Sequence, residues 1–196
     1  MLRYYRQNIT LAIIASVCAV MFLSSCGKST QTVTAAVTTQ TSTAKRSTVS
    51  MSTITMPAEH QKFATISCER IGLNTDLYWG DSDSDLRYGA GQDTDTALPG
   101  SATPALIGGH CQTIFNPLKN VQTGDEFVIT TSYGTYTYKV EEIKIIDKNT
   151  FDYCILNKTD YQAIIYTCYP FEKVNYVKQD RMMLFCTLQS GPLLVK

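Results

Sequence analysis

The chain contains a succession of short strand-like segments, and this pattern constrains its fold more than any other feature. The longest covers residues 136–146, where apolar and polar side chains alternate as in a strand with one buried face. Turn-forming residues separate the segments, and the other strands are expected over residues 64–70, 74–79, 104–109, 126–131, 162–168 and 181–188. Many strands with few helical patterns predict an all-β domain, either a barrel or a sandwich.

Two short helices are expected between these strands. One begins within residues 81–85, where an aspartate or serine is a suitable N-cap, and the other lies within residues 151–160. The carboxylates of residues 81–85 also suggest calcium, but the segment lacks the glycine and the distal glutamate of an EF-hand loop, so capping is favoured. Residues 89–100 are expected to form a loop that ends in a turn.

The first 26 residues predict an export signal or membrane anchor. Arg3 and Arg6 precede a nearly uninterrupted apolar run over residues 9–23. This run is short for a membrane-spanning helix, which needs about 20 residues, and it fits the core of an export signal. It ends in Leu-Ser-Ser-Cys-Gly, which resembles the lipobox of bacterial lipoproteins, so Cys26 is a candidate lipidation site. The alternative is an uncleaved anchor helix; both interpretations tether the rest of the chain outside the cytoplasmic membrane.

Residues 27–56 predict a disordered spacer. Half of them are serine or threonine and none is aromatic, so the segment buries too little apolar surface to offset its ordering entropy. The folded domain is therefore expected over residues 57–196. The chain has a formal net charge of zero and no basic stripe, which argues against nucleic acid as a partner.

Seven cysteines are present, but their spacing is not that of a disulfide framework. Two belong to the leader, which leaves an odd number in the domain: Cys68, Cys111, Cys154, Cys168 and Cys186. Several of these lie in apolar runs, as small buried residues do. The absence of a Cys-x-x-Cys pair argues against zinc, and we predict neither a metal site nor a cofactor.

Three residues with complementary chemistry stand at the ends of expected strands. His110 follows a Gly-Gly pair, Cys168 ends its strand shortly before Pro170, which cannot donate to a strand ladder, and Arg181 opens the last strand. A thiolate is a nucleophile, an imidazole moves protons, and a guanidinium donates to an oxyanion. The set is complete for acyl transfer. Taken singly, each residue also has a structural explanation, and periodicity alone does not bring the three together.

The order of these residues resembles the sortase family. The family signature Thr-Leu-x-Thr-Cys corresponds here to Ile164-Ile165-Tyr166-Thr167-Cys168, with the threonine before the cysteine retained. Tyr169-Pro170-Phe171, directly after it, is similar to class D in particular. The likeness covers residues 64–188 and includes Leu98-Pro99-Gly100, Ile107-Gly108-Gly109-His110, Phe115-Asn116-Pro117-Leu118, Gly124-Asp125 and Tyr136-Thr137-Tyr138-Lys139-Val140.

This resemblance implies a closed β-barrel of about eight strands with one or two short helices, and a cysteine transpeptidase. Cys168 would attack the threonine carbonyl of an LPxTG-like sorting motif near the C-terminus of an exported protein. His110 would transfer protons for the departing and incoming amines, Arg181 would stabilise the oxyanion, and Thr167 would line the substrate groove. An amine of a cell-wall precursor would receive the protein at the outer face of a Gram-positive cell membrane. Selectivity for the motif is expected in residues 151–160 and 169–180.

Several alternatives remain open at this point. A hydrolase would use the same acyl-enzyme with water as the acceptor, and a non-catalytic barrel lipoprotein would act as a binding module. No long lid segment precedes the barrel, which favours wall anchoring over pilus polymerisation. A Cys111–Cys168 disulfide is conceivable, but strand alternation favours a Cys111 side chain that points away from the site. Glu141 and Glu142, adjacent on one strand, face opposite sides and are expected at the surface rather than in a calcium site.

Overall fold

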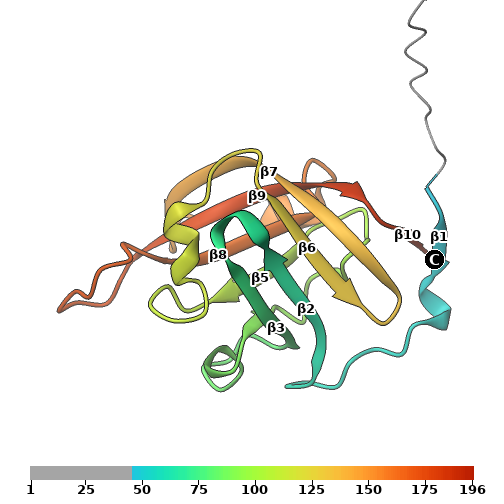
Figure 1. The fold of residues 1–196 in the computed structure, drawn as a ribbon, viewed down its shortest axis with the longest axis horizontal. Helices are drawn as coiled ribbons and strands as arrows, with labels where there is room; N and C mark the ends of the chain where they lie inside the picture. Colours follow the sequence, from blue (N-terminus) through green and yellow to red (C-terminus); the bar gives the residue numbers. More distant parts are fainter. Residues whose placement is uncertain (1–45) are drawn as a thin grey trace, which may run out of the picture. The chain divides into compact units, whose positions relative to one another are not determined.

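The computed structural model describes residues 46–196, so the predicted export signal, Cys26 and the spacer up to residue 45 lie outside the described residues. Eight strands close into a barrel (Figure 1). Their order around it is β2 (Lys62–Cys68), β3 (Leu73–Trp79), β4 (Ala90–Gln92), β5 (Ala105–Gly109), β8 (Ala163–Tyr169), β9 (Asp180–Ser190), β7 (Gly134–Asp147) and β6 (Glu126–Thr131), which pairs with β2. Only β3–β4 and β5–β8 are parallel pairs in this barrel. The prediction of an all-β closed barrel is confirmed.

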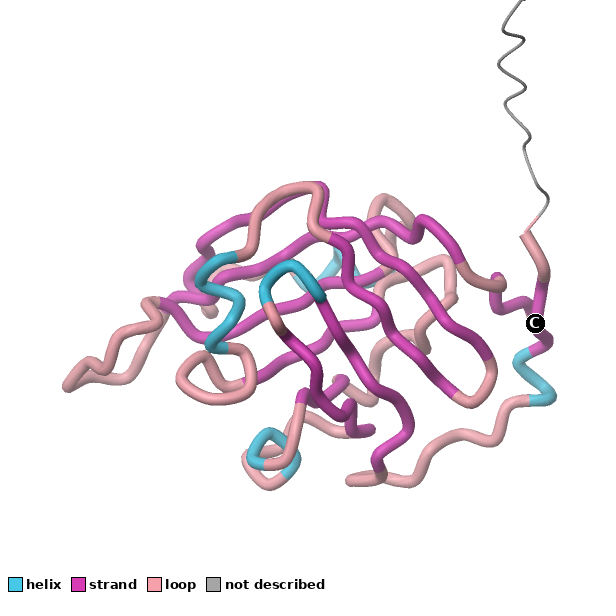
Figure 2. Tube along the Cα trace, in the orientation of Figure 1, coloured by secondary structure: helices cyan, strands magenta, loops and turns pink. Residues whose placement is uncertain are grey.

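Every helix within residues 46–196 is a short 3-10 turn (Figure 2), and there are more of them than the one or two expected: η1 (Met51–Thr53), η2 (Glu69–Ile71), η3 (Asp85–Arg87), η4 (Asn116–Asn120) and η5 (Tyr153–Asn157). No helix in this part of the chain has the length and apolar character that crossing a membrane requires. The helix start predicted within residues 81–85 is confirmed, because η3 begins at Asp85 and the hydroxyl of Ser82 accepts the backbone N–H of Asp85 at 3.4 Å. The carboxylate of Asp85 is buried and accepts hydrogen bonds from Ser82, while Ser84 at the N-cap of η3 makes no side-chain capping bond.

The barrel interior is filled by alternate side chains of its strands. In β6, Phe127 and Ile129 are fully buried, whereas Val128 between them is partly exposed and Glu126 and Thr130 on either side are exposed. Burial of a large apolar side chain stabilises the fold by about 1.5–3 kcal/mol. The same alternation supplies the rest of the interior, which includes Ile66, Leu77, Ile107, Tyr136, Tyr138, Ile165 and Leu184.

A second apolar cluster covers part of the outer surface of the barrel. Its buried members come from β5, β8 and β9, and the connection between β7 and β8 packs over them through residues that include Phe151, Ile155 and Tyr161. Strand β8 is therefore covered on both faces, which explains why Ile164 and Ile165 are consecutive apolar residues. Their side chains belong to the outer and inner clusters respectively.

The spacer prediction is wrong for residues 46–56. Strand β1 (Thr48–Ser50) pairs in parallel with β10 (Leu193–Val195), a strand that was not predicted. The Arg46 side chain donates hydrogen bonds at 2.9 Å to the carbonyl oxygens of Leu188 and Gln189. Ser/Thr-rich composition does not prevent order here, because the backbone finds partners in the C-terminal strand. The ordered domain thus begins before residue 57.

Candidate functional site

Three neighbouring strand ends carry the side chains that were identified from the sequence. β5 runs parallel to β8 with Gly109 opposite Thr167, so His110 leaves β5 beside the position of Cys168. β9 runs antiparallel to β8, and Arg181 lies directly opposite Cys168. Residues directly opposite each other in neighbouring strands share a face of the sheet. Cys168 and Arg181 therefore project from the same side.

A pocket of about 660 Å³ is lined by all three of these side chains. Each is partly exposed, so an incoming substrate can reach it. The loop between β8 and β9, residues 170–179, supplies most of the remaining wall and projects from the end of the barrel (Figures 1 and 2). The wall carries cationic but no acidic side chains, and its other residues are Cys111, Gln112, Thr113, Lys173, Val174, Asn175, Val177 and Lys178.

The guanidinium of Arg181 is held by the backbone rather than by a carboxylate. Its Nη1 donates to the carbonyl oxygens of Lys178 and Asp180, each at 3.0 Å. No ion pair within residues 46–196 involves Arg181. A guanidinium has five N–H donors in a fixed fork, so the group retains donors for an oxyanion in the pocket.

Thr167 does not line this pocket, contrary to the expectation that it contacts substrate. Its neighbours on β8 face outward, so its own side chain points into the barrel and is only 1% exposed. The hydroxyl donates to the carbonyl oxygen of Gly109 at 2.6 Å. The bond joins β8 next to Cys168 with β5 next to His110. Thr167 therefore holds two strand ends together.

Cys111 lies in the pocket rather than pointing away from it. The alternation that favoured the opposite orientation does not apply, because β5 ends at Gly109 and Cys111 follows in a turn. Its side chain is buried, and its sulfur accepts a hydrogen bond from the Lys178 ammonium at 3.2 Å. All five cysteines of residues 46–196 are free thiols, so Cys111 and Cys168 are not joined.

The other thiols are poorly placed for chemistry. Burial raises the pKa of Cys68 and of Cys186 above the ordinary thiol value, so both stay protonated near neutral pH. Cys154 is exposed on η5 and does not line this pocket. Among the described residues, no three potential metal ligands cluster together.

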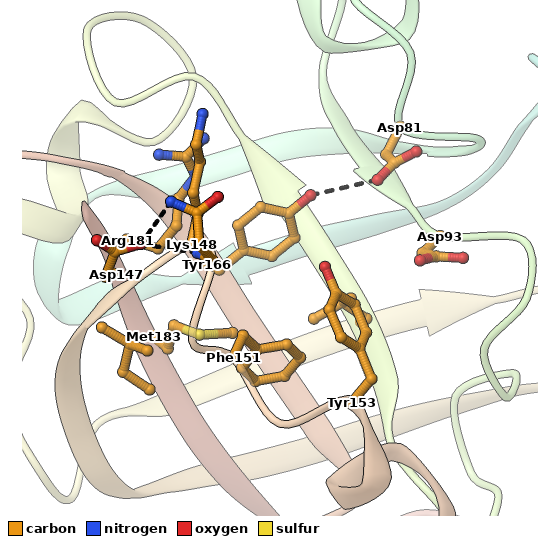
Figure 3. Close-up of a pocket in the computed structure, with 12 residues that line it drawn as sticks. Asp81, Asp93, Asp147, Lys148, Phe151, Tyr153, Tyr166, Arg181 and Met183 are labelled. Atoms are coloured by element: carbon orange, nitrogen blue, oxygen red, sulfur yellow. Dashed lines mark hydrogen bonds between the residues drawn. The ribbon is translucent and has the colours of Figure 1, made fainter. Parts of the chain in front are cut away.

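A second pocket, of about 310 Å³, shares Arg181 with the first (Figure 3). It lies on the outer apolar cluster, and Leu106, Met183, Phe151 and Tyr153 line it. The ring of Tyr166 crosses β5 directly over Gly108, where a Cβ would come within 2.7 Å of the ring. The sequence analysis did not identify Tyr166 as a site residue. The signal that was available is Gly108 on the neighbouring strand, because a glycine there leaves room for a large ring.

The far side of this second pocket is acidic. Figure 3 shows Asp81 and Asp93 across the pocket from Arg181, with the Tyr166 ring between them. The Tyr166 hydroxyl donates to Asp81 at 3.2 Å. Burial, together with the nearby charge of Asp93, raises the pKa of Asp81, and burial raises the pKa of Tyr166. The site is therefore a groove with an apolar floor, an acidic end, and a cationic end beside the thiol.

Comparison with known proteins identifies relatives of this arrangement. Residues 66–189 match the family model described as a sortase domain. Sortase D of Bacillus subtilis (strain 168) is 28% identical over 118 residues, which cover 60% of this chain and 60% of that protein. The match thus spans less than two thirds of the relative's length.

Solved structures agree with these matches. A Sortase D5 transpeptidase from Clostridium perfringens superposes with a TM-score of 0.59 at 26% identity, over 69% of this chain and 83% of that chain. Sortase A from Listeria monocytogenes gives 0.57 at 20% identity, over 69% and 92%, and at that identity supports the fold alone. The predicted barrel and the resemblance to class D are both confirmed.

Proposed function

The chain belongs to the sortase family, and we propose that it is a cysteine transpeptidase that joins exported proteins to an amine of the cell wall. The observation that supports this activity best is the convergence of His110, Cys168 and Arg181 on one pocket from three adjacent strand ends. A binding module would not need a nucleophile, a proton carrier and an oxyanion donor at one accessible place.

The first half of the reaction is cleavage of the sorting motif. The Cys168 thiolate attacks the carbonyl carbon of the threonine in an LPxTG-like motif, forms a carbon–sulfur bond and generates an oxyanion. Arg181 donates hydrogen bonds to that oxygen, a stabilisation that acts where charge develops. When the carbonyl re-forms, the carbon–nitrogen bond breaks, and protonated His110 gives its proton to the departing amine.

The second half restores the Cys168 thiolate and completes the transfer. An incoming amine of a cell-wall precursor loses its proton to His110 and attacks the thioester carbon. Collapse of this intermediate breaks the carbon–sulfur bond and releases the Cys168 thiolate with an amide as product. Arg181 serves the second oxyanion as it served the first, because both form at the same carbon.

The second pocket is suited to the motif residues that precede the scissile bond. Its floor of Leu106, Met183 and Phe151 is apolar, as a leucine and a proline require. Arg181 lines both pockets, so a peptide that lies along the floor brings its next carbonyl to the thiol. The loop of residues 170–179 lines the first pocket, and Phe151 and Tyr153 line the second, so both segments would set the motif preference.

The N-terminal residues would tether this enzyme to the outer face of the membrane. Residues 1–26 supply an apolar segment and Cys26 a lipid acceptor, while the barrel carries the site. Labelling of cells with a tagged fatty acid separates the two anchors. A lipidated protein takes up the label and loses it in Cys26→Ala, whereas an uncleaved helix anchors an unlabelled protein in both cases.

Product analysis tests the proposed activity. The purified protein is incubated with a panel of fluorescent sorting-motif peptides, with and without candidate amines. We expect at least one peptide to give an amide product whose yield rises with amine concentration. Cleavage that yields only the free acid at every amine concentration would show a hydrolase instead, and an intact panel would contradict both activities.

A further inference from the structure

A lysine stands where the three proposed catalytic segments meet. The Lys178 ammonium donates to the carbonyl oxygen of Pro170 at 2.5 Å and to the sulfur of Cys111 at 3.2 Å. Pro170 follows Cys168 closely on one segment, and Cys111 follows His110 directly on another. One side chain thus connects the two chain segments that carry the nucleophile and the proton carrier.

The backbone of the same lysine holds the third group. Its carbonyl oxygen accepts a hydrogen bond from Nη1 of Arg181 at 3.0 Å. Any movement of residue 178 therefore shifts both the ammonium and the guanidinium anchor. Lys178 lies three residues before Arg181, so the short chain between them limits how far the two residues can move independently.

The loop has few other restraints on the side that faces His110. Most of its side chains are exposed, among them Tyr176 at 64% and Val177 at 71%. Within residues 46–196, the bond to Cys111 is the only side-chain hydrogen bond from residues 170–179 to the segment after β5. Phe171 and the carbonyl oxygen of Gln179 restrain the two ends of the loop. Ordering of the part between them costs conformational entropy, so loss of the bond to Cys111 should make that part more mobile.

On the basis of the function proposed above, we propose that Lys178 is a positioning residue that keeps His110, Cys168 and Arg181 in reactive geometry. It is half-buried, and an ammonium has three donors and no acceptor. The Pro170 carbonyl and the Cys111 sulfur use two donors. Cys111 thereby acquires a role as the acceptor that fixes the histidine segment, which explains a second thiol beside the first.

The test compares the full chain with four single variants and one double variant. Lys178→Met keeps the aliphatic stem and removes the donors, and Cys111→Ala removes one acceptor and keeps the charge. Lys178→Arg keeps a cation with donors, and Lys119→Met, at an exposed lysine of η4, is the matched control. Misplacing reacting groups lowers turnover steeply, so Lys178→Met should reduce kcat about tenfold or more with KM changed less than about threefold.

Three further results are expected. Lys178→Arg recovers most of the lost kcat, Lys119→Met matches the unmodified chain, and Lys178→Met combined with Cys111→Ala is no worse than Lys178→Met alone, because both break one link. A kcat for Lys178→Met within twofold of the unmodified chain would overturn the positioning role. Fully additive losses in the double variant would overturn the link through Cys111.

Hydrogen exchange needs no substrate, so it tests the role of Lys178 independently of the proposed transpeptidase activity. Hydrogen exchange of residues 110–115 and 169–179 should accelerate in Lys178→Met and remain unchanged in Lys119→Met. Unchanged exchange in Lys178→Met refutes the tether even if the enzyme transfers peptides. Faster exchange in a protein that transfers no peptide supports the tether while the transpeptidase assignment fails.

Discussion

At the scale of single residues, the site depends on which face of β8 each side chain takes. Tyr166 and Cys168 point outward to the two pockets, and Thr167 between them points inward. The thiol is therefore accessible, while the threonine is committed to the Gly109 carbonyl. A shift of β8 by one residue would exchange the faces of Thr167 and Cys168, so the register of this strand decides which of the two side chains faces the pocket.

The inward position of Thr167 leads to a first prediction. Thr167→Val removes the hydroxyl and leaves a buried carbonyl without its partner, which should lower the free energy of unfolding by about 1–3 kcal/mol. Turnover should fall because the strand ends loosen, while KM stays nearly constant. Urea unfolding and steady-state kinetics measure both. A raised KM with unchanged stability would instead place the hydroxyl in contact with substrate.

Sequence reasoning identified the chemistry of these residues better than their orientation. Cys168 and Arg181 could be assigned to strand ends, because a proline follows one and an apolar run follows the other. The inward turn of Thr167 could not be predicted, since Ile164 and Ile165 are both apolar and hide the alternation. They do so because β8 is covered on both faces.

At the scale of elements, short segments set the shape of the groove. The β7–β8 connection with η5 builds the apolar wall, and β5 contributes a glycine that leaves room for the Tyr166 ring. Ion pairs secure other junctions. Arg70 of η2 pairs with Asp125, which precedes β6, and Asp125 also accepts the backbone N–H of Gln122.

Gly108→Ala should disturb the groove more than the fold. A methyl group at this position would meet the Tyr166 ring at 2.7 Å and displace it from the second pocket. We expect KM for the sorting-motif peptide to rise about fivefold or more and stability to fall by about 1–3 kcal/mol. Peptide titration with thermal melting checks this, and an unchanged KM would exclude Tyr166 from motif binding.

The Arg70–Asp125 pair should give a pH-dependent contribution to stability. The hydrogen bond from Arg70 holds the pKa of Asp125 below its ordinary value of 3.8. A depressed carboxyl pKa stabilises the fold above the unfolded value, and this stability is lost as pH falls through the folded value. Asp125→Asn should therefore cost about 1.5–3 kcal/mol at pH 7. Urea unfolding at several pH values should show that the difference in free energy of unfolding between Asp125→Asn and the unmodified chain shrinks below about pH 4. A difference that stays constant from pH 7 to pH 2 would show that the charge of Asp125 is not its cause.

At the scale of the whole molecule, closure of the barrel depends on β4, a short strand that the sequence pattern did not reveal. β4 is three residues long and lies in a segment that was predicted to be a loop. Its Gly91 packs so closely that a Cβ would lie 2.3 Å from the Gly80 carbonyl oxygen. Barrel and sandwich could not be separated from the residues alone, because closure depends on this short parallel pairing with β3, which has no periodicity to detect.

Residues 46–56 are part of the folded domain, and removal of these residues should lower its stability. A chain that starts at residue 57 loses the β1–β10 pairing and both Arg46 bonds, whereas one that starts at residue 46 keeps them. We expect the shorter chain to be less stable by about 2 kcal/mol, or roughly 4–8 °C in Tm. Equal melting temperatures for the two chains would support the original spacer prediction.

The central claim is that Cys168 forms a thioacyl-enzyme, and intact-protein mass spectrometry tests it most directly. The protein is mixed with a sorting-motif peptide without amine and quenched in acid, and the adduct is located by peptide mapping. We predict a mass increase equal to the acyl fragment, carried by Cys168, discharged by added amine and absent in Cys168→Ala. An adduct on Cys111 or Cys154, or one that persists in Cys168→Ala, would contradict the account.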